Sequence, residues 1–186
     1  MEKRAAVAKI IYGIDLDYMY DDDKTCPGLC PICHNTIKKI PDIMYKVTKR
    51  KPDFMNTYDG FYIVSEKFKS FCEERKYPNL TFILLEKSTG FYYFEAQYIY
   101  ELDYVRRKVR FIMKRDCCGN YDEIIGATPG YKRESFNMTT NDFICRSEYL
   151  FGSHWKKNPL IIIGLETAKA MKEYGLKEIY FTDIYL

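Results

Sequence analysis

Cysteines are the residues of this sequence whose spacing most clearly indicates chemistry. Cys30 and Cys33 lie in the run Cys26-Pro27-Gly28-Leu29-Cys30-Pro31-Ile32-Cys33-His34, and Cys117-Cys118 follows much later in the chain. Two thiolates at C-x-x-C spacing hold one Zn²⁺ from a tight turn, and a tetrahedral site then needs two more ligands. A site closed by four protein ligands is structural, because a catalytic zinc keeps one position open. The sequence therefore predicts a structural zinc centre.

The complete ligand set stays open at this stage. Five of the seven cysteines fall in the two clusters, which favours a metal over isolated buried thiols. Neighbouring residues rarely both reach one ion, so we expect one cysteine of the later pair to bind and Cys26 to supply the fourth sulfur. His34 directly follows Cys33 and meets the same geometric objection. The candidate ligands are Cys26, Cys30, Cys33, His34, Cys117 and Cys118, whereas Cys72 and Cys145 are predicted to be core thiols.

Other chemistry has little support in the sequence. A thioredoxin-type C-x-x-C opens a helix after a strand, but Pro27, Gly28 and Pro31 indicate an irregular loop. The chain has two histidines, and His154 lies in an aromatic stretch without a nucleophile motif such as G-x-S-x-G. Neither a P-loop nor a dinucleotide-binding glycine motif is present. We therefore expect a protein that is not an enzyme and has no small-molecule substrate.

Two stretches are candidates for contact with a partner protein. Asp21, Asp22 and Asp23 form an acidic patch before the first cysteines, and lack the glycine of a calcium-binding loop. The stretch 149–155 is aromatic and broken by Gly152, which predicts an exposed loop carrying Tyr149, Phe151 and Trp155. We expect a partner-binding surface that includes either the acidic patch or the loop at 149–155, and the acidic patch would present a negative face to a basic partner.

A nucleic-acid-binding zinc ribbon is the alternative. The basic stretch contains Arg106, Arg107, Lys108, Arg110, Lys114 and Arg115 around Phe111, so cations for phosphates alternate with a ring for base stacking. The same alternation is typical of a half-exposed strand, and the net charge is only +3. Binding to nucleic acid is therefore the less favoured hypothesis.

The remaining pattern predicts an α+β fold with mainly antiparallel strands and two or three helices. We expect one domain, 1–186, because 186 residues suffice for one good core. Two strand-helix-strand units, 61–86 and 160–186, resemble a degenerate internal duplication around a central hairpin, 91–115. The alignment places Phe61 on Leu160, Ser65 on Gly164 and Leu80 on Leu176, with one gap near Tyr77. The hairpin would carry the second cysteine pair toward the first.

Cellular location is inferred from what the sequence lacks. It has no run of about 18 apolar residues and no evident export signal, so neither a membrane span nor secretion is expected. An odd number of cysteines without such a signal favours free thiols over disulfides. The expected compartment is the reducing cytoplasm, and no membrane is expected among the partners.

Both cysteine clusters and the repeated units together resemble bacterial proteins of the double-CxxC and polymorphic-toxin immunity type. The matching segments are Cys30-Pro31-Ile32-Cys33, Cys117-Cys118-Gly119, 63–68 with 80–85, and 161–185. His34 replaces the expected knuckle glycine, and Arg115 replaces the first cysteine of a second C-x-x-C. The resemblance implies a non-enzymatic protein that binds and neutralises a partner protein, usually a toxin encoded beside it.

Overall fold

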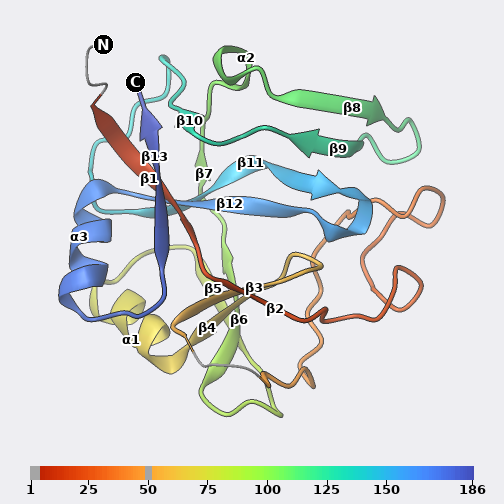
Figure 1. Cartoon of the computed structure of the whole chain (residues 1–186), viewed down its shortest axis with the longest axis horizontal. Coiled ribbons are helices and arrows are strands. Elements are labelled where there is room, and N and C mark those ends of the chain that lie inside the picture. The colour runs from red at the N-terminus through yellow and green to blue at the C-terminus, as the bar shows by residue number, and fades with distance from the viewer. Residues whose placement is uncertain (1–4, 49–51) are drawn as a thin grey trace.

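The computed structural model describes residues 5–48 and 52–186 (Figure 1). The strands are β1 Ala6–Tyr12, β2 Ile14–Leu16, β3 Phe54–Thr57, β4 Tyr62–Ser65, β5 Leu80–Leu84, β6 Phe91–Ala96, β7 Ile99–Tyr100, β8 Arg110–Lys114, β9 Tyr121–Ile125, β10 Gly130–Tyr131, β11 Ile144–Ser153, β12 Asn158–Ile163 and β13 Tyr180–Tyr185. The helices are α1 Glu66–Glu74, α2 Tyr104–Arg107 and α3 Leu165–Glu173, with a 3₁₀ turn, η1 His154–Lys156.

The strands form two sheets. The larger sheet has the order β10-β13-β1-β12-β11-β9-β8, with β7 also paired to β11, and the smaller has the order β2-β3-β4-β6-β5. Most neighbours are antiparallel, and the parallel pairs are β10 with β13, β7 with β11, and β2 with β3. The predicted α+β class, with mainly antiparallel strands and three helices, is confirmed.

The two strand-helix-strand units share one local design. In the smaller sheet, β4 and β5 are parallel to each other because both pair antiparallel with β6 between them. In the larger sheet, β12 and β13 flank β1 in the same way. Each helix residue of the first unit corresponds to the residue 99 positions later, as in Ser65 and Gly164 before the two helices. Common ancestry of the units remains a prediction.

The turns that follow the two helices support the correspondence at 99 positions, and they need no gap in the alignment of the two units. After α1, Lys76 donates to the Glu73 carbonyl and Tyr77 to the Cys72 carbonyl. After α3, Gly175 and Leu176 donate to Lys172 and Met171 in the same pattern. Tyr77 therefore matches Leu176, whereas the sequence alignment placed Leu80 there. The alignment paired two leucines because they are the same residue type. The hydrogen bonds of the turn after each helix show instead that Tyr77 and Leu176 occupy the same position.

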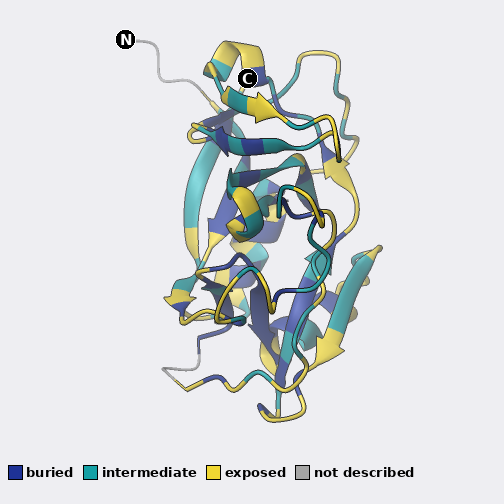
Figure 2. Cartoon of the chain, turned by 90° about the vertical axis from the view of Figure 1, so that its right-hand side faces the viewer, coloured by how far each residue is buried: buried dark blue, intermediate teal, exposed yellow. Residues whose placement is uncertain are grey.

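A shared core holds the sheets together. The largest buried cluster combines Phe54, Val64 and Phe94 from the smaller sheet with Ile161 and Ile163 from the larger sheet. Both helices contribute to it, and Figure 1 shows α1 in yellow beside α3 in blue. Figure 2 shows the buried residues along the inner strands and the exposed ones mainly on loops and strand ends.

The central hairpin predicted over 91–115 is wrong. β6 pairs with β4 and β5, whereas the basic strand β8 pairs with β9 across the turn that contains Cys117 and Cys118. The intervening chain passes from one sheet to the other through β7 and α2. Alternating strands look alike in sequence, so the pattern at 91–115 did not reveal that its halves belong to different sheets.

Among the described residues, no helix is long and apolar enough to cross a membrane.

Candidate metal centre

Two turns with the same backbone design carry the clustered cysteines. In the first turn, Cys30 N–H donates to the Asn35 carbonyl, and His34 N–H donates to the Cys30 carbonyl. In the second, Arg115 donates to Asn120, and Gly119 to Arg115, each residue being 85 positions later. His34 and Gly119 both have positive φ, 57° and 73°, which explains the glycine of the second turn and the left-handed histidine of the first.

The equivalence of the turns also accounts for the unusual cysteine pair. Cys33 and Cys118 occupy the same position in their turns, whereas Arg115 stands where Cys30 would be repeated. Cys117, the residue directly before Cys118, supplies the second thiol of this turn instead. The expectation that only one of the adjacent cysteines would reach the site is wrong, because both sulfurs of this tight turn lie in the same cluster as those of the first turn.

The four sulfurs of Cys30, Cys33, Cys117 and Cys118 lie within 4.8 Å of one another. The Sγ atoms of Cys30 and Cys117 are 3.7 Å apart, and those of Cys33 and Cys118 are 3.5 Å apart. A tetrahedron with metal–sulfur bonds of about 2.3 Å has sulfur–sulfur edges of about 3.8 Å. A disulfide would require about 2.05 Å. The cluster is therefore compatible with a metal site and has the spacing of separate thiols.

Thiol chemistry in the cluster favours metal binding. Burial tends to raise the pKa of Cys33, but hydrogen bonds from the Asn35 backbone and from neighbouring thiols outweigh it and lower the pKa to about 6. The hydrogen bond with Cys33 is the main cause that raises the pKa of Cys117 to about 12. A thiolate is thus available near neutral pH, and thiolates are the species that bind metals.

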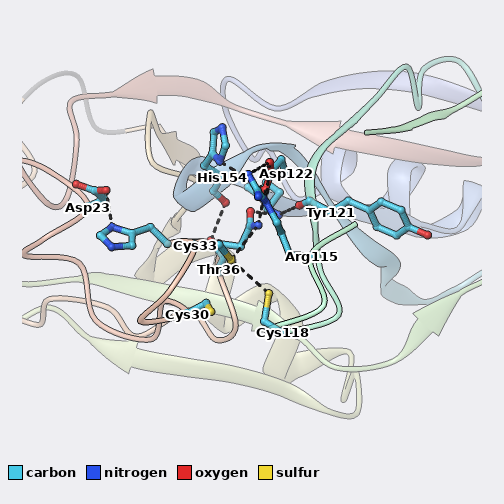
Figure 3. A network of polar contacts seen from close by, with 12 residues as sticks. Asp23, Cys30, Cys33, Thr36, Arg115, Cys118, Tyr121, Asp122 and His154 are labelled. Carbon is cyan, nitrogen blue, oxygen red and sulfur yellow. Dashed lines mark hydrogen bonds and ion pairs between the residues drawn. The ribbon is translucent and has the colours of Figure 1, made fainter. Parts of the chain in front are cut away.

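A charged network lies behind the cysteines (Figure 3). The Asn35 amide donates to Cys33 Sγ over 3.4 Å and to Asp122 Oδ1 over 2.8 Å. Arg115 makes a two-pronged contact with Asp122, and this pair is the main cause that lowers the pKa of the carboxyl to about 2. Lys157 is 2% exposed and donates to Asn35 Oδ1 over 2.8 Å. Two cations therefore lie close to the sulfur cluster.

The remaining sulfur and imidazole candidates lie outside this cluster. Cys26 is buried in a hydrophobic cluster with Leu16 and Phe61, and burial raises its pKa to about 11. His34 Nδ1 is 2.7 Å from Asp23 Oδ2. Cys72 and Cys145 are buried in the two other hydrophobic clusters, as the sequence predicts. The expectation that Cys26 completes the site is not supported, because Cys117 takes that place.

The partner-contact residues expected at 149–155 divide into core and surface. Tyr149 and Phe151 lie in β11 rather than in a loop, and Phe151 is 8% exposed and packed in the hydrophobic core. Phe151 is therefore a wrong prediction for a surface residue. The glycine-broken aromatic pattern suggested a loop, but β11 passes through Gly152 at a positive φ of 114°. Trp155 follows in η1 and remains partly exposed.

Trp155 instead belongs to an aromatic patch with Tyr18 and Tyr58. The Tyr18 ring lies 5.5 Å from that of Tyr58 and 6.0 Å from that of Trp155. Tyr18 and Tyr58 are 42% and 50% exposed. The Lys156 ammonium lies 4.8 Å from the centre of the Tyr18 ring. This patch was missed because its members are far apart in sequence.

The patch and the acidic residues border the sulfur cluster. Asp21 and Asp22 are exposed, and Asp23 lines a surface pocket together with Cys33, Cys117 and Trp155. The buried Asp59 carboxylate accepts hydrogen bonds from the Met19 and Tyr20 backbone and so holds the segment that carries Tyr18. The role of Asp59 in holding this segment could not be predicted, because a single aspartate in a loop carries no recognisable sequence pattern.

Three arginines of the basic stretch make contacts within the protein. Arg115 binds Asp122, Arg107 donates to the Thr128 carbonyl, and the Arg106 guanidinium lies 4.4 Å from the centre of the Tyr131 ring. Phe111 packs between Tyr121 and Tyr149, with ring centres 5.1 Å away in each case. Arg110 and Lys114 remain exposed on β8, but the expected stacking ring is occupied.

The centre joins the two sheets. Cys30 and Cys33 lie in the connection between β2 and β3 of the smaller sheet, and Cys117 and Cys118 lie in the β8–β9 turn of the larger sheet. Asn120 strengthens the junction by donating to the Thr36 carbonyl over 3.1 Å. No protein-family model and no curated protein matches the sequence. Function must therefore be inferred from the geometry of the molecule.

Proposed function

We propose that this protein binds and neutralises a partner protein without catalysing a reaction, and that a structural Zn²⁺ on Cys30, Cys33, Cys117 and Cys118 fixes the binding face. The observation that carries the proposal is the position of the sulfur cluster, which lies between the two sheets and shares a surface pocket with Asp23 of the acidic patch and Trp155 of the aromatic patch. The resemblance to immunity-type proteins, which neutralise toxins in the bacterial cytoplasm, agrees with this arrangement.

Zinc suits the donor set. Four thiolates within reach of one point favour Zn²⁺, which has no geometric preference beyond the tetrahedral arrangement of its ligands. Four thiolates around one Zn²⁺ carry a net charge of about −2. The buried Lys157 ammonium and the Arg115 guanidinium offset part of that charge, and Asn35 donates to one sulfur. When bound, the ion supplies a crosslink between the sheets and takes no part in a reaction.

The binding face combines two features that protein interfaces use. Asp21, Asp22 and Asp23 give it negative charge, which attracts a basic partner and raises the association rate. Tyr18, Tyr58 and Trp155 provide large rings of the kind that dominate binding energy at the centre of interfaces. Both features lie on segments that the metal centre and Asp59 immobilise, which lowers the entropic cost of association.

Binding is tested by measuring the affinity of the purified, metal-loaded protein for proteins encoded beside its own gene. Trp155→Ala should weaken a detected complex at least about thirtyfold, the effect of a central interface residue. Replacing Asp21, Asp22 and Asp23 with asparagine should lower the association rate and its dependence on salt. Tyr98→Ala is the matched control, because Tyr98 is 55% exposed but lies elsewhere, after β6.

A metal-loaded protein that binds none of these proteins, yet binds an oligonucleotide in a manner lost on Arg110→Ala and Lys114→Ala, would favour the nucleic-acid alternative. Turnover of a small substrate would contradict the non-enzymatic assignment.

A further inference from the structure

The β5 edge of the smaller sheet is unlike the edges formed by β2, β8 and β10. β2 and β10 end their sheets with only three and two residues, and β8 carries Arg110 and Lys114. Short strands and charged side chains are common protections against edge-to-edge pairing. β5 has five residues, Leu80-Thr81-Phe82-Ile83-Leu84, with neither a charge nor a proline. Within the described part of the chain, no strand pairs with its outer edge.

In the second strand-helix-strand unit, another strand pairs with the equivalent edge. β13 is the counterpart of β5, and its outer edge pairs with β10 through Gly130 and Tyr131. The first unit lacks an equivalent of β10 among the described residues. The side chains at the end of β5 are also exposed, Ile83 at 36% and Leu84 at 49%, and β5 lies at the lower right margin of Figure 2.

We propose that β5 pairs with β5 of a second copy of this chain, antiparallel and across a two-fold axis, so that the smaller sheets of two molecules become continuous. A two-fold axis requires the antiparallel direction, because each residue must meet its own symmetry mate or exchange places with another. With the axis at Phe82, Leu80 of each copy lies opposite Leu84 of the other and Thr81 lies opposite Ile83, so no charged side chain enters the pairing.

Charge complementarity at the ends of the strand supports a second copy as the occupant. Lys76 precedes β5 and Glu86 follows it, and both are exposed. In the antiparallel arrangement, Lys76 of one copy lies at the same end of the pairing as Glu86 of the other, and the two-fold axis repeats this arrangement at the opposite end. The dimer is independent of the metal centre and of the binding face, which lie in other parts of the molecule.

The association state in solution tests the pairing. Sedimentation velocity over a range of concentrations should show a reversible dimer of the metal-loaded wild-type protein. Ile83→Lys places a charge on the edge and should give a monomer at every concentration. Val105→Lys is the matched control, because Val105 is 88% exposed on α2, and it should leave the dimer intact.

Charge reversal identifies the occupant of the edge. Lys76→Glu and Glu86→Lys should each raise the dimer dissociation constant roughly tenfold, because two symmetry-related contacts become repulsive. The double variant should recover most of the wild-type affinity, since the pairs are attractive again with their signs exchanged. A monomeric wild-type protein at every concentration would overturn the proposal, and so would a dimer that is unaffected by Ile83→Lys or a double variant without recovery.

Discussion

The two strand-helix-strand units have the same local design but complete it in different ways. In the first unit, the middle strand β6 follows β5 after a short turn. In the second unit, the middle strand β1 comes from the other end of the chain. The first unit is therefore built from local contacts, whereas the second closes only when the N-terminal and C-terminal segments meet. Contacts between distant segments form slowly, so the second unit should be the later one to fold.

The flanks of the units differ as well, and the candidate metal centre lies where they differ. The first unit extends through β3 and β2 into the loop with Cys30 and Cys33, and the second extends through β11 and β9 toward Cys117 and Cys118. The helices and core join the units at one end, and the four sulfurs cluster between them at the other. The repeated design thus supplies the framework, and the unrepeated segments carry the function that we propose.

Removing the metal ligands should have the largest effect on stability, and it tests whether the sulfur cluster joins the two units. Cys30→Ser combined with Cys33→Ser should abolish zinc binding and lower the free energy of unfolding by several kcal/mol, on the order of 5, because metal binding contributes directly to folding. Elemental analysis should find one zinc per wild-type chain and none in the variant. Hydrogen exchange should show the loss of protection concentrated in the loop at 17–48 and the β8–β9 turn, with α1 and α3 least affected.

Cys26→Ser is the control for that experiment. Cys26 is buried near the site but outside the sulfur cluster, so this variant should keep its zinc. Loss of zinc in Cys26→Ser with retention in Cys117→Ser would mean that the ligand set is wrong.

The features that could be predicted from the sequence are those set by residues close together in the chain. The two units, the Ser65 cap of α1 and the buried face of Phe68, Phe71 and Cys72 follow from spacing within a few residues, and the structure has all of them. The four metal-site cysteines were all candidates for the same reason. Ser65 accepts a hydrogen bond from Phe68 N–H, the contact that its position before an amphipathic stretch predicts.

Features that depend on distant pairing were not predictable from these patterns. The strand β6 has the alternation of a hairpin partner for β8, but the partner of each strand is decided by which faces must be buried together. The aromatic patch joins Tyr18, Tyr58 and Trp155 from three separate segments. The one overlooked local signal is the match between Cys33-His34-Asn35 and Cys118-Gly119-Asn120, which would have identified two equivalent turns.

Truncating the equivalent buried positions of the helices should show which unit depends more on apolar packing. Phe68 and Thr167 correspond, and each is fully buried. Phe68→Ala should cost about 3 to 5 kcal/mol, because its ring packs on Phe54 and Phe94. Thr167→Ala should cost about 1 to 3 kcal/mol, mainly through the lost partner of Phe143 N–H. Urea unfolding measures both, and equal losses would contradict the assignment of different core roles.

Asp142 should give the junction of the helices a dependence on pH. Burial tends to raise the pKa of its carboxyl, but hydrogen bonds from Tyr77, Arg75 and Thr167 lower it overall. A lowered pKa in the folded state stabilises the protein above the unfolded value, about 3.9, and this contribution is lost as the pH falls through the folded value. Asp142→Asn should therefore cost about 1 to 2 kcal/mol at pH 7.

The difference between Asp142→Asn and wild type should shrink as the pH falls below the unfolded value, about 3.9, and disappear only below the lowered folded pKa of Asp142, where both side chains are uncharged. Urea unfolding at a series of pH values measures it. A difference that stays constant from pH 7 to pH 3 would show that the carboxylate charge is not responsible.

Substitutions directly after the two helices should give the smallest changes in the free energy of unfolding, equal in size and opposite in sign. Lys76 and Gly175 occupy the same left-handed position, with φ of 56° and 77°. A side chain at such a position costs about 1 kcal/mol, a cost that glycine avoids. Lys76→Gly should therefore raise the free energy of unfolding by up to about 1 kcal/mol, and Gly175→Ala should lower it by about as much. A Cβ at 175 would lie 3.4 Å from the flexible Lys67 ammonium, so the penalty there comes from the backbone. Effects of the same sign in urea unfolding would mean that the helix ends are not equivalent, and the correspondence at 99 positions would then fail at the point where its geometry is clearest.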